Sequence, residues 1–263
     1  MKKRIVEILI GLTIFVIAGC GTTQNQNTSS TPAELIPPEL TVAAASDLAR
    51  AFTEVGAAFE DKYDCSVVFS FGSTGLLAEQ IANGAPFDVF AAANESFIDD
   101  LNSEGHVVSD TIQLYAMGRI GIVTMKDRDV EATTFEDLLS SEVRIVSIAN
   151  PDHAPYGLAA KQALITAGYW DVLEPKLAYG RNISDALEYV VTGNADAGII
   201  ALSLKDDTHD FTLLDDNLHE PLRQAAAVVS ASEHQELARV FISFVLSEEG
   251  QEIMNRYGFI LPE

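Results

Sequence analysis

The segment Thr41–Phe59 most constrains the fold, because it joins an apolar strand directly to an amphipathic helix. Its first residues, TVAAA, predict a buried strand over Thr41–Ala45. A helix is predicted to begin at Ser46, whose hydroxyl suits the N-cap, and Asp47 follows where a carboxylate favours the helix dipole. Residues at helical spacing predict one apolar face: Leu48, Phe52, Val55 and Phe59. Such a junction presents N–H groups at the carboxyl end of a strand, where open α/β sheets bind ligands and a helix N-terminus suits an anion.

A second junction of the same type follows in the next part of the chain. The β-branched and aromatic run Cys65–Phe71 predicts a strand, and Gly72-Ser73-Thr74-Gly75 leads into a helix that ends near Asn83-Gly84. Both junctions lie at strand ends of what should be one sheet, so their small residues are candidate ligand donors: Ala45, Ser46, Ser73 and Thr74. An ordinary capping role is the alternative for each hydroxyl, and capping is compatible with binding.

Strands and helices alternate through the rest of the chain, which predicts an α/β fold with parallel sheets and crossover helices. The run Ile112–Thr124 predicts a long strand or a pair of strands, which could cross between two lobes. Residues 205–220 are acidic and are predicted to form a loop.

The first nineteen residues are typical of a secretory signal and not of a folded domain. Three basic residues precede the apolar run Ile5–Ile17, which is too short for a membrane span of ~20 residues. The sequence Ile17-Ala18-Gly19-Cys20 resembles the bacterial lipoprotein processing box, in which Cys20 is lipidated. An ordinary signal peptide over residues 1–19 is the alternative. Residues 20–39 are polar and contain proline, which predicts a flexible tether.

Cysteine content and charge limit the function classes. With Cys20 lipidated, Cys65 has no partner for a disulfide and is predicted to be a buried, inert thiol. Residues 1–19 hold three basic residues and one acidic residue, so their removal changes the formal net charge from −23 to −25. This charge excludes nucleic-acid binding through the surface, which needs Lys and Arg to displace counterions. It also opposes capture of anions by bulk attraction, so local N–H and O–H donors would have to bind them.

A secreted serine hydrolase that uses Ser73 or Ser46 is the alternative function class. The sequence has no G-x-S-x-G elbow, no phosphate-binding P-loop motif and no H-E-x-x-H zinc motif. The histidines are scattered and show no metal-ligand spacing. We expect His153 to brace its proline-rich loop by a hydrogen bond, in preference to a catalytic role. Three histidines are predicted to lie on the surface: His209, His219 and His234.

Several motifs in combination resemble those of periplasmic molybdate-binding proteins, the receptors of ABC-type importers. They cover about residues 40–261 and are AAASDL, FGSTG, NGAPFDVFAAAN, NPDHAPYG, NISDAL and RYGF. The resemblance implies a type II periplasmic-binding-protein fold, with two lobes that are each a mostly parallel sheet flanked by helices. The oxyanion would be held without its water shell in the cleft between the lobes. We expect lobe I to comprise residues 40–117 and 223–263, and lobe II residues 118–222.

The resemblance also implies ligand positions for molybdate or tungstate. They are Ser46 and Thr74 in lobe I, with Ala45 and Ser73 beside them, and Tyr156 and Ile183 in lobe II. Ile183 would bind through its N–H, and Tyr156 through its N–H and its hydroxyl. Some members place a tyrosine where this chain has Ala201, and Tyr156 would take over its role. The family implies a monomeric, extracytoplasmic receptor without enzyme activity or cofactor, which binds the metal only as an oxyanion and has a membrane permease as its partner.

A site built only from donors has a physical basis for selectivity. Molybdate, tungstate and sulfate carry no proton at neutral pH, so donors can satisfy every oxygen. Phosphate retains a proton and needs an acceptor. Two nearby carboxylates could provide one, but we interpret Asp47 as a partner of the helix dipole and Asp88 as a strand-entry residue. A sulfate- or phosphate-type receptor on the same fold remains the alternative ligand class.

Overall fold

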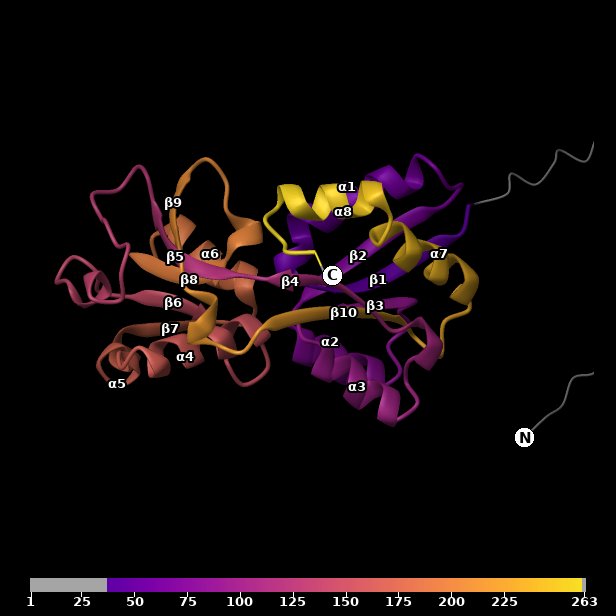
Figure 1. Ribbon diagram of the computed structural model, residues 1–263, viewed down its shortest axis with the longest axis horizontal. Helices are drawn as coiled ribbons and strands as arrows, with labels where there is room; N and C mark the ends of the chain where they lie inside the picture. Colours follow the sequence, from indigo (N-terminus) through magenta and orange to yellow (C-terminus); the bar gives the residue numbers. More distant parts are fainter. Residues whose placement is uncertain (1–36, 262–263) are drawn as a thin grey trace, which may run out of the picture. The chain divides into compact units, whose positions relative to one another are not determined.

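The structure is a computed structural model that describes residues 37–261, and Figure 1 shows its two five-stranded sheets with their flanking helices. The predicted two-lobed α/β fold is thereby confirmed. The predictions for the signal segment 1–19, for Cys20 and for most of the tether 20–39 lie outside the described residues. Of the helices that are described, none has both the length and the apolar character needed to span a membrane.

The first sheet has the strand order β2-β1-β3-β10-β4. Strands β2, β1 and β3 are parallel, and β10 pairs antiparallel with both β3 and β4. The strands of this sheet are β1 (Glu39–Ala45), β2 (Ser66–Gly72), β3 (Val89–Ala92), β4 (Gln113–Gly118) and β10 (Leu222–Val228). The alanine-rich run of β1 is therefore a central strand with neighbours on both sides, as the absence of polar alternation in it predicts.

The second sheet repeats this topology with the order β7-β6-β8-β5-β9. Strands β7, β6 and β8 are parallel, and β5 pairs antiparallel with β8 and β9. Its strands are β5 (Ile120–Met125), β6 (Val146–Ala149), β7 (Leu177–Gly180), β8 (Ala197–Ala201) and β9 (His209–Leu213). Of the two alternatives predicted for Ile112–Thr124, a long strand or a pair, the structure has the pair, β4 and β5, in different sheets. The residue limits of the two lobes stay a prediction.

Helices cover both faces of each sheet, and in the first sheet α1 and α8 lie on the opposite face from α2 and α3 (Figure 1). The first sheet carries α1 (Ala49–Glu60), α2 (Thr74–Ala82), α3 (Glu95–Ser103), α7 (Gln235–Val245) and α8 (Glu248–Arg256). The second carries α4 (Pro155–Thr166), α5 (Trp170–Leu173) and α6 (Ile183–Thr192). The side chains of Asn94 and Asn182 cap α3 and α6, because each accepts a first-turn N–H group.

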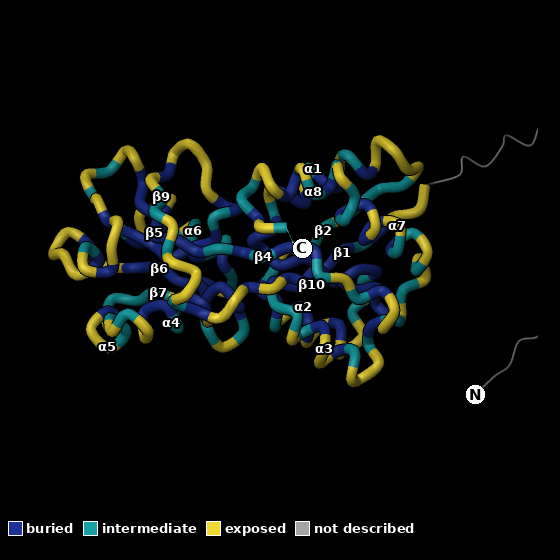
Figure 2. The backbone as a smooth tube through the Cα atoms, in the orientation of Figure 1, coloured by how far each residue is buried: buried dark blue, intermediate teal, exposed yellow. Residues whose placement is uncertain are grey.

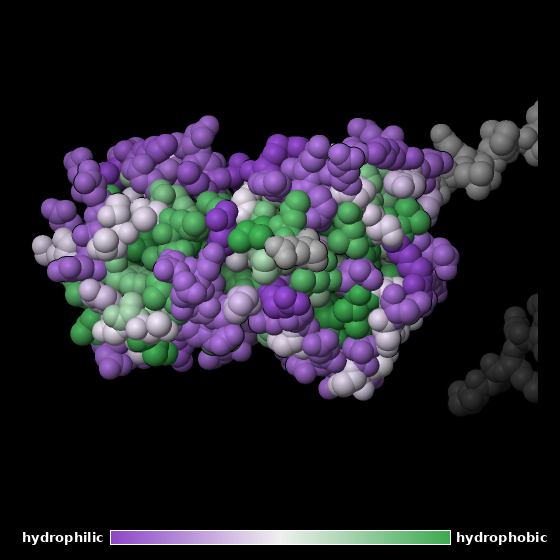
Figure 3. All heavy atoms as spheres, in the orientation of Figure 1, coloured by the Kyte–Doolittle hydropathy of each residue, from purple (hydrophilic) through white to green (hydrophobic). Residues whose placement is uncertain are grey.

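Burial of its apolar face holds α1 in place. Figure 2 shows the strands and the inner faces of the helices as buried, and the loops as largely exposed. The four residues predicted to face inward are at most 1% exposed: Leu48, Phe52, Val55 and Phe59. Each such side chain contributes about 1.5–3 kcal/mol by leaving water. This packing fixes the start of α1 relative to the strand before it. On the face drawn in Figure 3, hydrophilic side chains cover much of the surface, which suits a strongly acidic chain in water.

Two predictions of local structure are wrong. Residues Ser46–Leu48 form a 3₁₀ turn that leads into α1, and the Ser46 side chain makes no capping bond, so Ser46 is not the side-chain N-cap. The acidic segment 205–220 is not all loop, because it contains β9, which pairs with β5. The acidic composition of the segment does not predict a strand. A strand tolerates such residues here because β9 lies at the edge of its sheet, with one side toward water.

Cys65 is only partly buried, which corrects the prediction of a buried thiol. Desolvation, followed by the negative charges of Glu60 and Asp64, raises the pKa of this thiol. The reactive thiolate is therefore disfavoured, in agreement with the inert role expected for Cys65.

Candidate functional site

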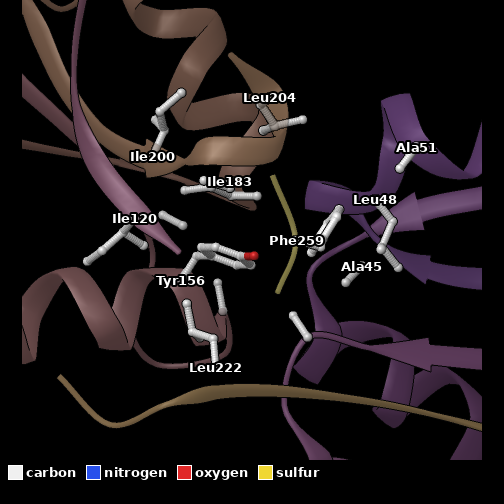
Figure 4. Close-up of a cluster of buried hydrophobic side chains, with 14 of the residues drawn as sticks. Ala45, Leu48, Ala51, Ile120, Tyr156, Ile183, Ile200, Leu204, Leu222 and Phe259 are labelled. Atoms are coloured by element: carbon white, nitrogen blue, oxygen red, sulfur yellow. The ribbon is translucent and has the colours of Figure 1, made fainter. Parts of the chain in front are cut away.

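Residues from both lobes enclose one small cavity of about 10 Å³. Its lining consists of Ala45, Ser46, Asp47, Gly72, Ser73, Thr74, Ala93, Ala154, Pro155, Tyr156 and Ile183. The structure thus brings together all six residues that the sequence singled out as candidate ligands. Figure 4 shows Tyr156 and Ile183 of lobe II across from Ala45 of lobe I. The described lining includes no Lys, Arg or His side chain, and the cavity suits a solute of only a few atoms.

Four helix N-termini converge on this cavity, two from each lobe. Lobe I contributes Ser46, at the start of the turn into α1, and Thr74, the first residue of α2. Lobe II contributes Tyr156, in the first turn of α4, and Ile183, the first residue of α6. First-turn N–H groups have no acceptor within their own helix, and these four find none elsewhere between residues 37 and 261. The helix dipoles add positive partial charge at the same place.

Two hydroxyl groups add to these donors. Ser46 Oγ accepts the N–H of Ser184 at 3.4 Å, and Thr74 Oγ1 accepts the N–H of Ala93 at 3.1 Å. Because a hydroxyl group has one proton and two acceptor positions, both oxygens still have a proton to donate. The cavity therefore offers donors without a cation, which is the chemistry of a site for a deprotonated oxyanion.

Ser73 lines the cavity, but its hydroxyl already has a partner in the other lobe. Ser73 Oγ donates to the carbonyl oxygen of His153 at 2.6 Å and lies 2.8 Å from His153 Nδ1. The N–H of Gly75 donates to the same carbonyl at 2.9 Å. A Cβ at Gly75 would lie 2.7 Å from that oxygen, so the glycine permits the close approach. The prediction that Ser73 supplies a free hydroxyl is wrong, and the bracing role expected for His153 is confirmed.

The Ser73–His153 contact does not have the make-up of a catalytic pair. A serine nucleophile needs a base that is itself oriented by a third group, usually a carboxylate. Within the described part of the chain, no carboxylate bonds to the ring of His153. The hydroxyl of Ser73 is also directed to a main-chain carbonyl in a residue that is only 4% exposed. The contact joins two lobes and offers no activated nucleophile.

Asp47 brings a carboxyl group to the wall of this cavity. It is fully buried, and its Oδ2 accepts a hydrogen bond from Gln224 Nε2 at 2.7 Å. Burial raises the pKa of Asp47 to about 6, although hydrogen bonds from Gln224 and Tyr156 act in the opposite direction. Asp47 lies in the first turn, as expected of a partner of the helix dipole, and its carboxyl group also contacts β10 through Gln224.

The Tyr156 hydroxyl belongs to the same buried group. It accepts the second N–H of the Gln224 amide at 2.9 Å. Burial, together with the nearby Asp47, raises the pKa of Tyr156 well above its usual value, so the phenol stays protonated. The main-chain N–H of Tyr156 remains available to a ligand, and the ligand role expected of the hydroxyl stays a prediction.

Asp88 lies outside the cavity and has its oxygens occupied. Oδ2 accepts from the N–H and the hydroxyl of Thr41 at 2.7 and 2.8 Å, and Oδ1 accepts from Ser232 Oγ at 2.6 Å. This is the role expected of a strand-entry residue. Of the two carboxyl groups considered, only Asp47 lines the cavity and lies close enough to interact with an anion there.

Two histidines expected on the surface are buried. His209 is 3% exposed, because it opens β9 and its Nδ1 accepts the N–H of Asp206 at 3.1 Å. Burial lowers its pKa. His219 is 9% exposed, with Nδ1 at 2.7 Å from the carbonyl of Glu220. His234 is exposed as predicted.

Sequence reasoning missed three polar residues that complete the contacts around the cavity. Ser184 Oγ donates to the carbonyl of Ser46 at 2.9 Å, and Ser203 Oγ donates to that of Asp47 at 2.8 Å. Gln224 forms the link between Asp47 and Tyr156. A signal for Gln224 is present in the strand LRQAAAV, where the polar Gln224 directly precedes an apolar run and must find hydrogen-bond partners when buried.

Comparison with known proteins decides the family. Residues 40–260 match the bacterial extracellular solute-binding proteins. The chain belongs to this family. This solute-binding protein is 31% identical over 224 residues to the molybdate-binding protein ModA of Rhodobacter capsulatus, which covers 84% of the chain and 88% of the relative. It is 28% identical over 264 residues to YvgL of Bacillus subtilis, by name a candidate ABC transporter substrate-binding lipoprotein, with 98% and 99% covered.

Among solved structures, the solute-binding protein is similar to the periplasmic molybdate-binding protein of Azotobacter vinelandii. The TM-score is 0.80 at 26% identity, and the match covers 85% of this chain and 100% of the other. The sulfate-binding protein SubI of Mycobacterium tuberculosis, at 17% identity and a TM-score of 0.71, shares the fold. The resemblance to molybdate-binding receptors inferred from the motifs is confirmed by these matches.

Proposed function

We propose that this solute-binding protein captures molybdate or tungstate outside the cytoplasm and presents it to the membrane permease of an ABC importer. The observation that carries the proposal is the cavity where four helix N-termini and two hydroxyls meet without a cation. The ligands are the N–H groups of Ser46, Thr74, Tyr156 and Ile183 and the hydroxyls of Ser46 and Thr74. Ala45 and Ser73 shape the wall and do not donate from their side chains. Relatives named for molybdate binding support this choice of ligand.

These donors are sufficient in energy for a receptor. A hydrogen bond to a charged group contributes ~1.5–3 kcal/mol. Four N–H groups and two hydroxyls therefore exceed the ~8 kcal/mol that corresponds to micromolar affinity. The excess offsets the cost of immobilising the ligand and closing the lobes. No arginine is needed, which explains how a chain of strongly negative net charge can bind an anion.

Charge state and size would set the selectivity. A fully deprotonated oxyanion can accept a donor on every oxygen, whereas the proton of hydrogen phosphate needs an acceptor. Sulfate has the same charge as molybdate but shorter bonds, so the radius of the cavity would separate the two. A sulfate- or phosphate-type receptor is the alternative that the experiment below decides.

We further propose that Cys20 carries a lipid anchor, which would hold the domain beside the membrane. We also propose that the domain works as a monomer. The name of the YvgL relative, which includes the word lipoprotein, supports the anchor. Metabolic labelling with a tagged fatty acid should mark the wild type and leave a Cys20→Ala variant unmarked. Equal labelling of both proteins would contradict the anchor.

Calorimetric titration with molybdate, tungstate, sulfate and phosphate tests the proposed ligand. We expect one site of micromolar or tighter Kd for molybdate or tungstate, and weaker or no binding of sulfate and phosphate. Binding of phosphate without binding of molybdate or tungstate would overturn the proposal. Hydrolysis of ester substrates that is lost in a Ser73→Ala variant would instead indicate a serine hydrolase.

A further inference from the structure

Asp47 combines features that a cavity for a dianion would not be expected to contain. It lines the cavity and is 0% exposed, and its Oδ1 has no hydrogen-bond partner among residues 37–261. An ionised carboxylate in this position is costly, because one of its oxygens has lost water without gaining a donor. A dianion beside it adds repulsion between like charges in a medium of low dielectric constant.

Both lobes cover Asp47. Gln224 of β10 donates to Oδ2, and the same amide binds the Tyr156 hydroxyl from α4 in the other lobe. Ser203, also in the second lobe, donates to the main-chain carbonyl of Asp47. Separation of the lobes would break the contacts from Tyr156 and Ser203 and admit water to the carboxyl group. The environment of Asp47 therefore depends on whether the site is closed.

The elements packed against Asp47 supply no compensating cation. The titratable groups that face it are the phenols of Tyr156 and of Tyr115, whose hydroxyl donates to Gln224 Oε1 at 2.9 Å. The charged residues on the adjacent α1 and α6 are Arg50, Glu54, Glu60, Asp185 and Glu188. The one cation among them, Arg50, binds the Lys205 carbonyl. The adjacent β2 and the turn Leu202–Leu204 carry no charged side chain.

We propose that the closed site holds its oxyanion together with one proton on Asp47, so that capture of a dianion takes up a proton from the solvent. The inference rests on the proposed function, because it concerns an oxyanion in the same cavity. In the open form Asp47 is hydrated and ionised. On closure around the dianion, a proton from water or buffer forms an O–H bond on the Asp47 carboxylate. This proton reduces the negative charge of the closed site by one unit. Opening releases the proton together with the ligand.

The sign of the pH dependence follows from the two states. Burial alone raises the pKa of Asp47 from 3.8 to about 6 in the closed arrangement, and a bound dianion raises it further. Affinity for a dianion is therefore greatest at low pH and falls as pH rises from about 4 through 6 and above. The fall approaches tenfold per pH unit where one full proton is taken up.

Calorimetry with sodium molybdate tests this directly on the wild-type protein. Titrations at pH 6.5 and 7.5, each in two buffers of different ionisation enthalpy, give the number of protons taken up per ligand. We expect net uptake that approaches one proton at the lower pH, with a weaker Kd at the higher pH. Molybdate binding without proton uptake at either pH would overturn the inference and leave the proposed function intact. Absence of heat with molybdate, tungstate, sulfate and phosphate would overturn both.

Two variants locate the proton. In Asp47→Asn, which keeps the size of the side chain and an acceptor for Gln224, we expect no proton uptake and no pH slope, with affinity at pH 7.5 at least equal to that of the wild type. Asp88→Asn is the matched control, because Asp88 is also buried in lobe I but lies outside the cavity. It should keep the wild-type proton number. Proton uptake that persists in Asp47→Asn would assign the proton to another group and contradict the proposal.

Discussion

The two walls of the cavity differ in what they offer an anion. Lobe I offers N–H groups and hydroxyls from Ser46 and Thr74, and it also contains Asp47. Lobe II offers the anion the main-chain N–H groups of Tyr156 and Ile183, while the Ile183 side chain packs in the core and the Tyr156 hydroxyl binds Gln224. Side-chain changes should therefore weaken binding in lobe I, whereas in lobe II only a change to the main chain should do so.

The largest expected effect comes from removal of a main-chain donor in lobe II. Ile183 is the first residue of α6, a position where proline is tolerated, and its N–H has no partner in the described part of the protein. Ile183→Pro should weaken molybdate binding by about 3 kcal/mol, or roughly 150-fold, because a hydrogen bond to a charged acceptor is lost.

The control for this variant is Ile183→Val, which keeps the N–H. It should lower the free energy of unfolding by about 0.5–1.5 kcal/mol through the lost methylene, with little change in Kd. Equal loss of affinity in both variants, measured by calorimetry, would show that lobe II acts through its side chains and would remove the contrast between the walls.

Removal of a hydroxyl in lobe I should have the next largest effect. Thr74→Ala and Ser46→Ala should each weaken binding by about 1–3 kcal/mol with the fold retained. Thr74→Ser keeps the hydroxyl that Ala93 bonds to and should bind within a few-fold of the wild type. Unchanged affinity in both alanine variants would contradict the assignment of the lobe I ligands.

The smallest effect is expected at Ser73, whose hydroxyl joins the lobes and does not bind the ligand. Ser73→Ala should cost about 0.5–1.5 kcal/mol of closed-state stability, which is the usual net worth of a hydrogen bond. Stopped-flow kinetics should show faster dissociation of molybdate with an unchanged association rate. A slower association rate with unchanged dissociation would place Ser73 among the ligands that meet the anion first.

The same contrast explains how much could be predicted from the sequence. The junctions at Ser46 and Thr74 were readable because small hydroxyl residues at strand ends have a recognisable pattern. Tyr156 and Ile183 bind through the main chain, which leaves no signature in residue type, so only the family resemblance indicated them. The helix α4 begins at Pro155, and this places the N–H of Tyr156 in its first turn.

Long-range contacts account for what could not be predicted. Gln224 meets Asp47 across 177 positions of sequence, because β10 returns to lobe I and inserts between β3 and β4. Local pattern carries no information about that insertion, and for Asp47 it indicates only a place in a first turn. The burial of His209 is not predictable for the same reason, since the pairing of β9 with β5 is also a long-range contact.

A crystal structure with tungstate bound, located by its anomalous scattering, tests the central claim most directly. The account predicts one tungsten atom between the two walls, with the N–H groups of Ser46, Thr74, Tyr156 and Ile183 donating to its oxygens and no Lys or Arg side chain in contact. Tungstate found instead in the groove lined by Arg50, Lys205 and Arg256 would contradict it, because capture would then depend on cations and not on neutral donors.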